Sequence, residues 1–444
     1  MEALGTGNKF GDFCDRGIVF SLCALIFVLP VSIALLDSFA ALAIFFYLLK
    51  KINRTGIDWP LRTSCLNLLG KIHFIWKGFS PPVNFLNRPL RFLTLAVFIS
   101  VLFSQYPGLS LFVFFGKFLK CVFLYFSFIE AFSDEKRIRI FLGFFLLSAF
   151  ITALNGAIQH YTGINFFKGR IAVGRINSFF STANGFGPYL LPVIGLVAHF
   201  LYTAIARNKS WILGGVLTLF LVLLLACLCW TYSRSSWVGF LVILFVMVLL
   251  DRRKILFLGA LSLVFIFIFL PSLTKARNLY LLNDSSAIPK ISDYLNIGTV
   301  LEHGGGRHFF WKKAISIIHS SPVWGTGLNT YTRIVRRDPD PSTWSWYAHN
   351  CYLQLAAETG LVGLACFLWM LFVLLRHGLN YCKQIKDWWP LTCLQGTVSG
   401  LFGFLVQSFF DNTFYTVQLS MLMWLIFGLM VAVTRLNPDS QKNR

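Results

Sequence analysis

The chain has 444 residues, of which 56% are hydrophobic and only 13% are charged, and its formal net charge is +21. With a mean hydropathy of +0.68, it carries more apolar surface than a water-soluble fold of this length can bury, so an ordinary soluble protein is excluded and a membrane protein is predicted. The positive charge does not indicate nucleic-acid binding, because membrane topology accounts for more than half of the basic residues.

Twelve apolar segments follow one another along the chain, and several approach the ~20 residues that a helix needs to cross the hydrocarbon core. The first two are nearly continuous and are separated only near Pro30 and Asp37. The predicted fold is therefore an all-α polytopic membrane protein, with residues 1–444 forming a single membrane domain. The predicted spans are 17–33, 34–50, 90–104, 109–131, 140–160, 187–206, 211–230, 236–250, 255–271, 351–375, 391–410 and 415–434.

Basic residues predict the orientation of these helices. With a cytoplasmic N-terminus, 24 of the 39 lysines and arginines fall in the loops and tails of the inner side, including the basic loop 51–89. The positive-inside rule then predicts that both termini are cytoplasmic. Thirteen further cations remain on the outer side, and the simplest explanation is an anionic ligand there. The last two, Lys117 and Lys120, lie within the fourth span as mid-membrane cations and are candidate supporting residues, because burying a charge is costly.

The longest connection, residues 272–350, is predicted to lie on the outer side and is too long to be a mere linker. Within it, Arg307–His319 distributes apolar and polar residues with helical periodicity, so an amphipathic helix lying along the membrane interface is expected. Pro322, Gly325 and Gly327 are turn residues that end this helix. The sequence contains no recognisable internal repeat.

His349 and Asn350 stand where this outer segment meets the tenth span. Asn350 is a typical N-cap for a helix that starts at Cys351, and helix punctuation alone could explain the pair. The alternative is that His349 is a general base, since an imidazole at the membrane surface can take a proton from a hydroxyl group. In that case Asn350 would be a supporting residue.

Three arginines on the predicted outer side are candidate ligands of an anion. Arg234 lies among small hydroxyl residues at the end of the seventh span, where it either binds an anion or extends toward the lipid headgroups. Arg175 lies in a polar loop with Asn184, which could cap the following helix or support an anion site. Arg307 follows three glycines at the start of the amphipathic helix. The planar fork of a guanidinium group suits the oxygens of a phosphate.

Patterns for other chemistries are missing from the sequence. The ten cysteines form no CxxC pair and no Cys/His spacing typical of a metal site. No acidic pair on the predicted outer side has the pattern of a metal–phosphate site, and no phosphate loop or dinucleotide loop occurs. If the protein catalyses a reaction, the sequence predicts one that uses no metal, nucleotide or other cofactor.

Taken in order, these motifs resemble those of the O-antigen ligase and O-antigen polymerase superfamily of bacterial envelope enzymes. The resemblance covers roughly residues 150–435 and includes the large outer loop between the ninth and tenth spans. Three patterns carry it: Arg175 with Asn184-Gly185, the segment Tyr232-Ser-Arg-Ser-Ser-Trp237, and the series Arg307, Trp311, Pro322, Gly325-Thr-Gly327, His349-Asn350, Gln354 and Glu358-Thr-Gly360.

The resemblance implies a GT-C-like, metal-independent inverting glycosyltransferase of the bacterial inner membrane, with its active site facing the periplasm. It implies that His349 activates the acceptor hydroxyl, and that Arg234, Arg307 and then Arg175 hold the diphosphate of an undecaprenyl-diphosphate-linked glycan.

Two activities within the superfamily, and one outside it, remain open. A ligase transfers the glycan to the lipid A–core sugar in lipopolysaccharide biosynthesis, whereas a polymerase transfers it to another carrier-linked repeat unit. The ligase is favoured, because two anionic lipids in one cavity suit the thirteen outer cations. The third reading is a flippase for polyprenyl-linked saccharides, against which the absence of a repeat counts.

Overall fold

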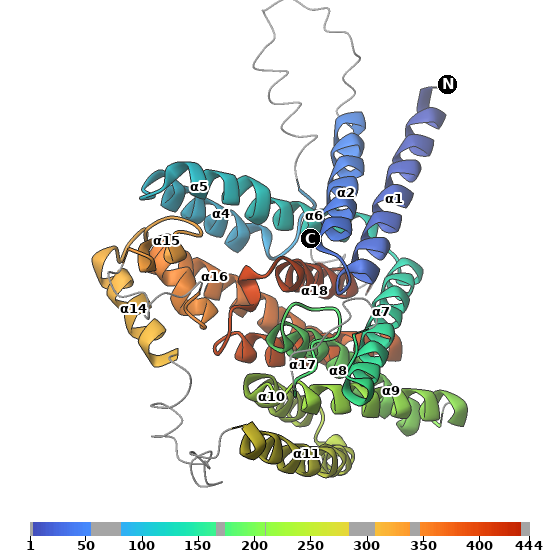
Figure 1. Cartoon of the computed structure of the whole chain (residues 1–444). Helices are drawn as coiled ribbons and strands as arrows, with labels where there is room; N and C mark the ends of the chain where they lie inside the picture. The colour runs from blue at the N-terminus through green and yellow to red at the C-terminus, as the bar shows by residue number, and fades with distance from the viewer. Residues whose placement is uncertain are drawn as a thin grey trace, which may run out of the picture.

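The computed structural model describes residues 3–54, 81–165, 174–208, 210–283, 307–337 and 347–436, and in these ranges its regular structure is entirely helical, with no β-strand. Every predicted span falls largely on a helix (Figure 1). The elements are α1 (Ala3–Val28), α2 (Ile33–Arg54), α4 (Asn87–Leu102), α5 (Pro107–Val113), the π-helix η2 (Phe114–Leu119), α6 (Lys120–Ala131), α7 (Glu135–Thr162), α8 (Ala183–Ala206), α9 (Trp211–Trp230), α10 (Arg234–Leu250), η3 (Arg252–Lys254), α11 (Ile255–Asn283), α14 (Arg307–Ser320), α15 (Tyr331–Val335), α16 (Cys351–Gln384), α17 (Trp388–Gln407), η5 (Thr413–Tyr415) and α18 (Val417–Arg435).

Eight of the described helical stretches are long and apolar enough to cross a membrane: α2, the continuous stretch α5–η2–α6, and α7, α8, α9, α16, α17 and α18. The predicted fold class, an all-α polytopic membrane protein, is confirmed. α10 is also apolar but shorter. The predicted amphipathic helix Arg307–His319 coincides with α14, and α11 continues past its predicted end at residue 271 to Asn283.

The centre of the packing is α17, which contacts both α8 and α10 (Figure 1). Glycines permit the approach. A Cβ atom at Gly400 would lie 2.6 Å from the Cα of Pro192 in α8, and one at Gly403 would lie 2.6 Å from the carbonyl oxygen of Gly239 in α10. Close van der Waals packing through small residues is a main source of attraction between helices in lipid, so these contacts hold the three helices together.

Gly400→Leu should therefore destabilise the fold by about 1–3 kcal/mol, the usual cost of overpacking a tight contact. Gly214→Leu in α9 is the matched control, because a Cβ at Gly214 meets no atom within 4 Å. Thermal unfolding in detergent should show a lower midpoint for Gly400→Leu and a midpoint near wild type for the control. Equal midpoints for the two variants would contradict the close α8–α17 contact.

Several helices begin at one end of the bundle. The Gln418 side chain, at the start of α18, donates hydrogen bonds to the carbonyl oxygens of Leu29 and Pro30 in the α1–α2 turn, at 2.7 and 3.1 Å. The start of α16 is joined to the end of α17, because the Cys351 N–H donates to the Ser408 carbonyl oxygen at 3.0 Å. α8 and α10 begin at this end too. We call it the site face, and the end at which α1 begins is the opposite face.

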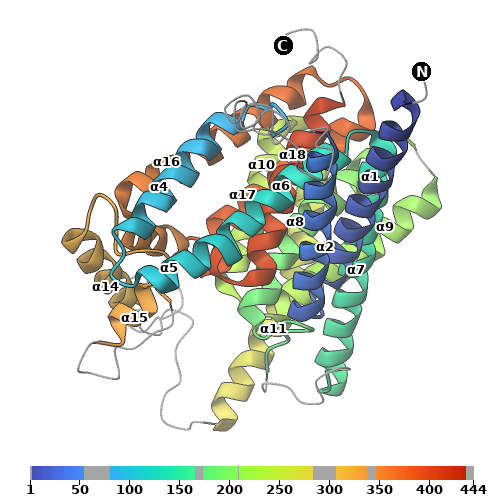
Figure 2. The ribbon, with the colours of Figure 1, turned by 90° about the horizontal axis from the view of Figure 1, so that it is seen from above.

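α16 is interrupted near its start at Gly360, which has φ 71° and ψ 177°. The interruption leaves carbonyl groups of α16 without hydrogen-bond donors in the helix itself. N–H groups of the turn 322–327 donate to them instead. For example, the Gly327 N–H donates to the Glu358 carbonyl oxygen at 2.9 Å. The predicted turn is present, with φ of +70° at Gly325 and +105° at Gly327. Irregular backbone is tolerated in a membrane domain where other parts of the protein satisfy it. The first turns of α16 are thereby attached to the segment that carries α14 and α15 (Figure 2).

Candidate active site

His349 lies on the site face, directly before α16. Its backbone has φ +51°, a left-handed conformation that is uncommon for a residue other than glycine and that recurs at functional sites. Asn350 follows as the N-cap of α16, and its side-chain oxygen accepts hydrogen bonds from the N–H groups of Tyr352 and Leu353, both at 3.0 Å. The predicted helix cap is present, and it also fixes the backbone next to the histidine.

Asp411 faces the His349 ring, a contact that the sequence did not indicate. Its Oδ1 lies 3.5 Å from His349 Nδ1, and the two side chains are 11% and 33% exposed. The Asn412 N–H donates to the same oxygen at 2.9 Å, and Cys351 Sγ donates to the Asp411 carbonyl oxygen at 3.1 Å. A carboxylate at Nδ1 orients an imidazole so that Nε2 can take a proton, and it stabilises the imidazolium that results. The pair brings a carboxylate beside the imidazole, within ion-pair distance but without a hydrogen bond at Nδ1 among the described residues.

α14 packs against α16 and against the histidine segment, residues 347–350, that precedes it. Trp311 Nε1 donates to the His349 carbonyl oxygen at 3.3 Å, and the centroid of the Phe310 ring lies 5.8 Å from that of the imidazole. The Tyr331 hydroxyl of α15 holds this helix in turn, donating to the Phe310 carbonyl oxygen at 3.1 Å. Arg307 is the first residue of α14, one turn before Trp311, so it stands on the helix face that meets the histidine.

Arg175 is anchored beside the end of α9. Its Nε donates to the Thr231 carbonyl oxygen at 2.8 Å, and its Nη2 donates to Asn184 Oδ1 at 2.7 Å. Asn184 is therefore a partner of Arg175, and the alternative that it caps α8 is wrong. Thr182 is the cap, since its hydroxyl accepts a hydrogen bond from the Gly185 N–H at 3.1 Å. Such anchoring holds the guanidinium group in one orientation at the site face.

Arg234 is the first residue of α10, and its exposed side chain has no hydrogen-bond or ion-pair partner among the described residues. The Oγ of its neighbour Ser235 lies 3.5 Å from Gln407 Nε2 at the end of α17. Ser408, which follows Gln407, accepts a hydrogen bond from the Cys351 N–H at the start of α16. The end of α17 therefore contacts both the start of α10 and the start of α16. A guanidinium group at a helix N-terminus creates a positive potential suited to an anion.

Glu358 is a second residue whose role sequence reasoning missed, although it is part of a motif noted above. It is fully buried in α16, and its carboxylate accepts hydrogen bonds from the Asn329 N–H at 2.8 Å and from the Gln354 side chain at 3.1 Å. Gln354 in turn accepts a hydrogen bond from the Ala348 N–H at 3.0 Å, directly before the histidine. Glu358 thus connects the turn after α14 with the segment that carries the candidate base.

Tyr415 of η5 completes this network. It is hydrogen-bonded to Glu358, and its ring centroid lies 6.2 Å from that of Tyr347. Burial, together with the nearby Glu358 carboxylate, raises the pKa of the Tyr415 hydroxyl well above its ordinary value. Tyr415 therefore keeps its proton at physiological pH and serves as a hydrogen-bond donor.

The two lysines predicted as supporting residues lie apart from the histidine. Lys120 Nζ is 2.6 Å from Asp37 Oδ1, and Lys117 lies in the π-helix η2 with an exposed side chain. Asp37 is only one turn from the start of α2, so the Lys120 ammonium group lies toward the site face. Both lysines line a cavity that includes Glu358 but not His349.

The described residues contain no group of three or more His, Cys, Asp or Glu side chains placed to hold a metal ion. A family model described as O-antigen ligase matches residues 219–368, the segment that contains Arg234, Arg307 and His349. Arg175 lies before the match. No curated protein matches the chain.

Proposed function

Because the chain belongs, through residues 219–368, to the O-antigen ligase and polymerase superfamily, we propose that it is an O-antigen ligase. It would be an inverting glycosyltransferase that moves a glycan from undecaprenyl diphosphate to a sugar of the lipid A–core. The site face would then be periplasmic, in the bacterial inner membrane. The observation that carries the proposal is the His349–Asp411 pair, with Nδ1 and Oδ1 3.5 Å apart, on the same face as Arg234 and Arg175.

In the proposed reaction, His349 Nε2 takes the proton of the acceptor hydroxyl as the hydroxyl oxygen attacks the anomeric carbon of the donor glycan. The bond between that carbon and the diphosphate oxygen breaks, and its electron pair leaves with the diphosphate, so the configuration inverts. The Asp411 carboxylate, 3.5 Å from Nδ1, stabilises the imidazolium by its charge, and the imidazolium then releases its proton to water. A general base of this kind contributes ~10²–10⁴-fold to the rate.

The arginines would act on the leaving group. Negative charge grows on the diphosphate as the anomeric bond breaks, and fixed guanidinium groups stabilise that charge without having to reorient. Arg175 is already held by Thr231 and Asn184, and Arg234 stands at the N-terminus of α10. Since a diphosphate is a good leaving group, the proposed chemistry requires neither a metal ion nor a nucleotide.

The choice of a ligase over a polymerase rests on charge. Its acceptor is itself a phosphorylated lipid, so the ligase brings two anionic lipids to one face. Thirteen lysines and arginines lie on the predicted outer side of the chain, more than one diphosphate needs. A polymerase would also use carrier-linked glycans, so the acceptor has to be tested directly.

The test uses purified protein with carrier-linked glycan, with and without lipid A–core, in EDTA and without nucleotides. We expect the glycan to appear on lipid A–core only when that acceptor is present. Lengthening of the carrier-linked glycan without lipid A–core would instead identify a polymerase. Loss of transfer in EDTA, restored by a divalent cation, would overturn the metal-free step. If the carrier-linked glycan instead crosses the membrane of vesicles that contain the protein, and no glycan is transferred to an acceptor, the protein is a flippase.

A further inference from the structure

The cavity lined by Lys117 and Lys120 lies between α4, η2, α6, α16 and α18. Its walls are mostly apolar and include Leu93, Val97, Phe118, Phe367, Met421 and Trp424. The cations that line it are Lys117 and Lys120. This combination of apolar walls with a cationic edge matches an amphiphile with a negative headgroup.

Two contacts place the cationic edge near the site face. Lys120 pairs with Asp37, one turn from the start of α2, at 2.6 Å. The Oγ of Ser420, one turn from the start of α18, lies 3.7 Å from the Sγ of Cys121, which follows Lys120 in the chain. A lipid with its headgroup at this surface would therefore meet the lysines with its phosphate, while its chains extend along the apolar walls.

The two lysines differ in their charge balance. Lys120 is neutralised by Asp37. Lys117 is exposed and has neither a hydrogen bond nor an ion pair among the residues that the structure describes. An exposed, unpaired ammonium group at the edge of an apolar cavity is available to pair with an anion. Lys117 also lies in a π-helix, a local change of helical register that is frequent at functional sites.

We propose that this cavity binds a phosphorylated acyl lipid, with its chains against the apolar walls and a phosphate on Lys117. The cavity is lined by Glu358 and Tyr415, and Glu358 is linked through Gln354 to the residue before His349, so the bound lipid would touch the network that supports the candidate base. The role of this lipid as the acceptor rests on the proposed function, whereas its binding does not.

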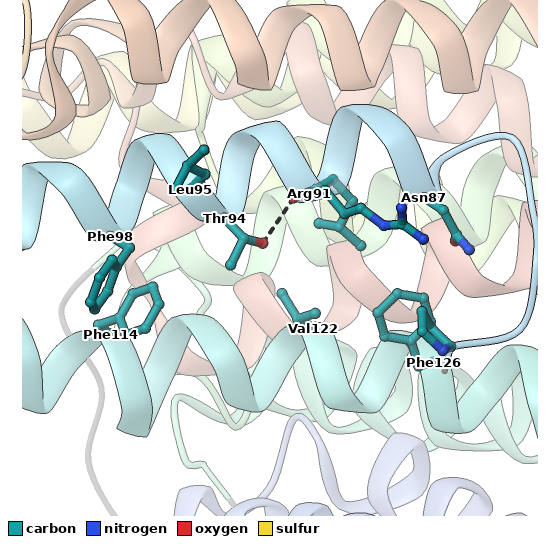
Figure 3. A pocket seen from close by; sticks show the side chains of 10 residues that line it. Asn87, Arg91, Thr94, Leu95, Phe98, Phe114, Val122 and Phe126 are labelled. Atoms are coloured by element: carbon teal, nitrogen blue, oxygen red, sulfur yellow. Dashed lines mark hydrogen bonds between the residues drawn. The ribbon is translucent and has the colours of Figure 1, made fainter. Parts of the chain in front are cut away.

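A different groove on the same helices supplies the control. α4 on one side and η2 with α6 on the other flank a groove of about 410 Å³ (Figure 3). Its walls include Phe98, Phe114 and Phe126, and its exposed cation is Arg91, near the end at which α4 begins. Arg91→Gln therefore removes one positive charge, as Lys117→Gln does, but from a residue of α4 that does not line the cavity of Lys117.

Native mass spectrometry of the purified protein measures the binding. The probes are a diphosphorylated, acylated glucosamine disaccharide, its dephosphorylated form, and undecaprenyl phosphate. Lys117→Gln should weaken binding of the phosphorylated acyl lipid by about tenfold, the loss of one charge-assisted hydrogen bond. It should leave the dephosphorylated form unchanged, and Arg91→Gln should change neither. Ser420→Trp, which fills the cavity, should weaken both acyl lipids, and its unfolding midpoint checks that it folds.

Normal binding by both Lys117→Gln and folded Ser420→Trp would overturn the proposal. If Lys117→Gln loses undecaprenyl phosphate and keeps the acyl lipid, the cavity holds the donor tail and the proposal is again wrong. If the binding pattern is as expected but no variant and no wild-type protein transfers glycan to the lipid, the proposed function fails while the binding site stands.

Discussion

Replacing His349 by alanine should lower glycan transfer by about 10²–10⁴-fold, the usual contribution of a general base, and leave binding of the carrier-linked glycan close to wild type. The reason is that the proposed base acts on the acceptor hydroxyl and not on the donor diphosphate. Single-turnover transfer rates and donor binding, measured on the same preparation, separate the two effects. His349→Ala with weak donor binding and a normal rate on bound donor would reverse the assignment.

Two further variants sharpen this test. Asp411→Asn keeps the shape of the side chain but removes the charge beside Nδ1, so the rate should fall. The double variant should be no slower than His349→Ala alone, because the two residues act as a unit. His377→Ala is the matched control, since His377 lies near the other end of α16 and stacks on Phe85 with ring centroids 4.2 Å apart. A large rate loss in the control would indicate damage to the helix and not to the base.

Replacing Arg234 by alanine should weaken donor binding by about tenfold or more and also slow transfer from the bound donor, because in the proposed reaction the arginine holds the diphosphate before and during its departure. Arg234→Lys should recover only part of each loss, since an ammonium group lacks the fork that grips two phosphate oxygens. Arg307→Ala should behave in the same way. Binding isotherms for the carrier-linked glycan and single-turnover rates measure both quantities.

Arg252→Ala controls for the loss of an arginine as such, because Arg252 follows the other end of α10, on the opposite face. It should bind and transfer like wild type. Normal donor binding by Arg234→Ala would remove this residue from the donor site. Full recovery in Arg234→Lys would show that charge, and not bidentate geometry, is what the site requires.

The parts of the structure that follow local rules could be predicted from the sequence. Each span is a continuous apolar run, and the cap at Asn350 depends only on N–H groups two and three residues ahead. Asp411 could not be predicted, because its contact with His349 brings together the end of α17 and the start of α16. Asn184 was ambiguous for a related reason. Threonine and asparagine both cap helices, and the tertiary contact with Arg175 decides which residue does so here.

The position of the two lysines relative to the site face was the other feature that the sequence could not supply. Lys117 and Lys120 fall in the middle of an apolar run, and hydropathy does not distinguish an α-helix from a π-helix. The structure divides that run into α5, η2 and α6 and sets Lys120 against Asp37, close to the start of α2. The position of a residue along an apolar segment gives its depth in the membrane only when the segment is one regular helix that runs straight from one membrane surface to the other.

The interruption at Gly360 has a consequence for recombinants between members of this family. Ala357 and Glu358 accept hydrogen bonds from the N–H groups of Thr326 and Gly327, so the start of α16 and the candidate base before it are attached to the segment that carries α14 and not only to the rest of α16. A crossover placed at residue 350, the apparent boundary between loop and helix, would join a turn from one parent to a helix start from the other. Such a chimera should insert and stay stable but misplace the His349 side chain, which lowers the transfer rate if His349 is the base. Exchanging residues 307–361 as one block keeps the base and its support from a single parent.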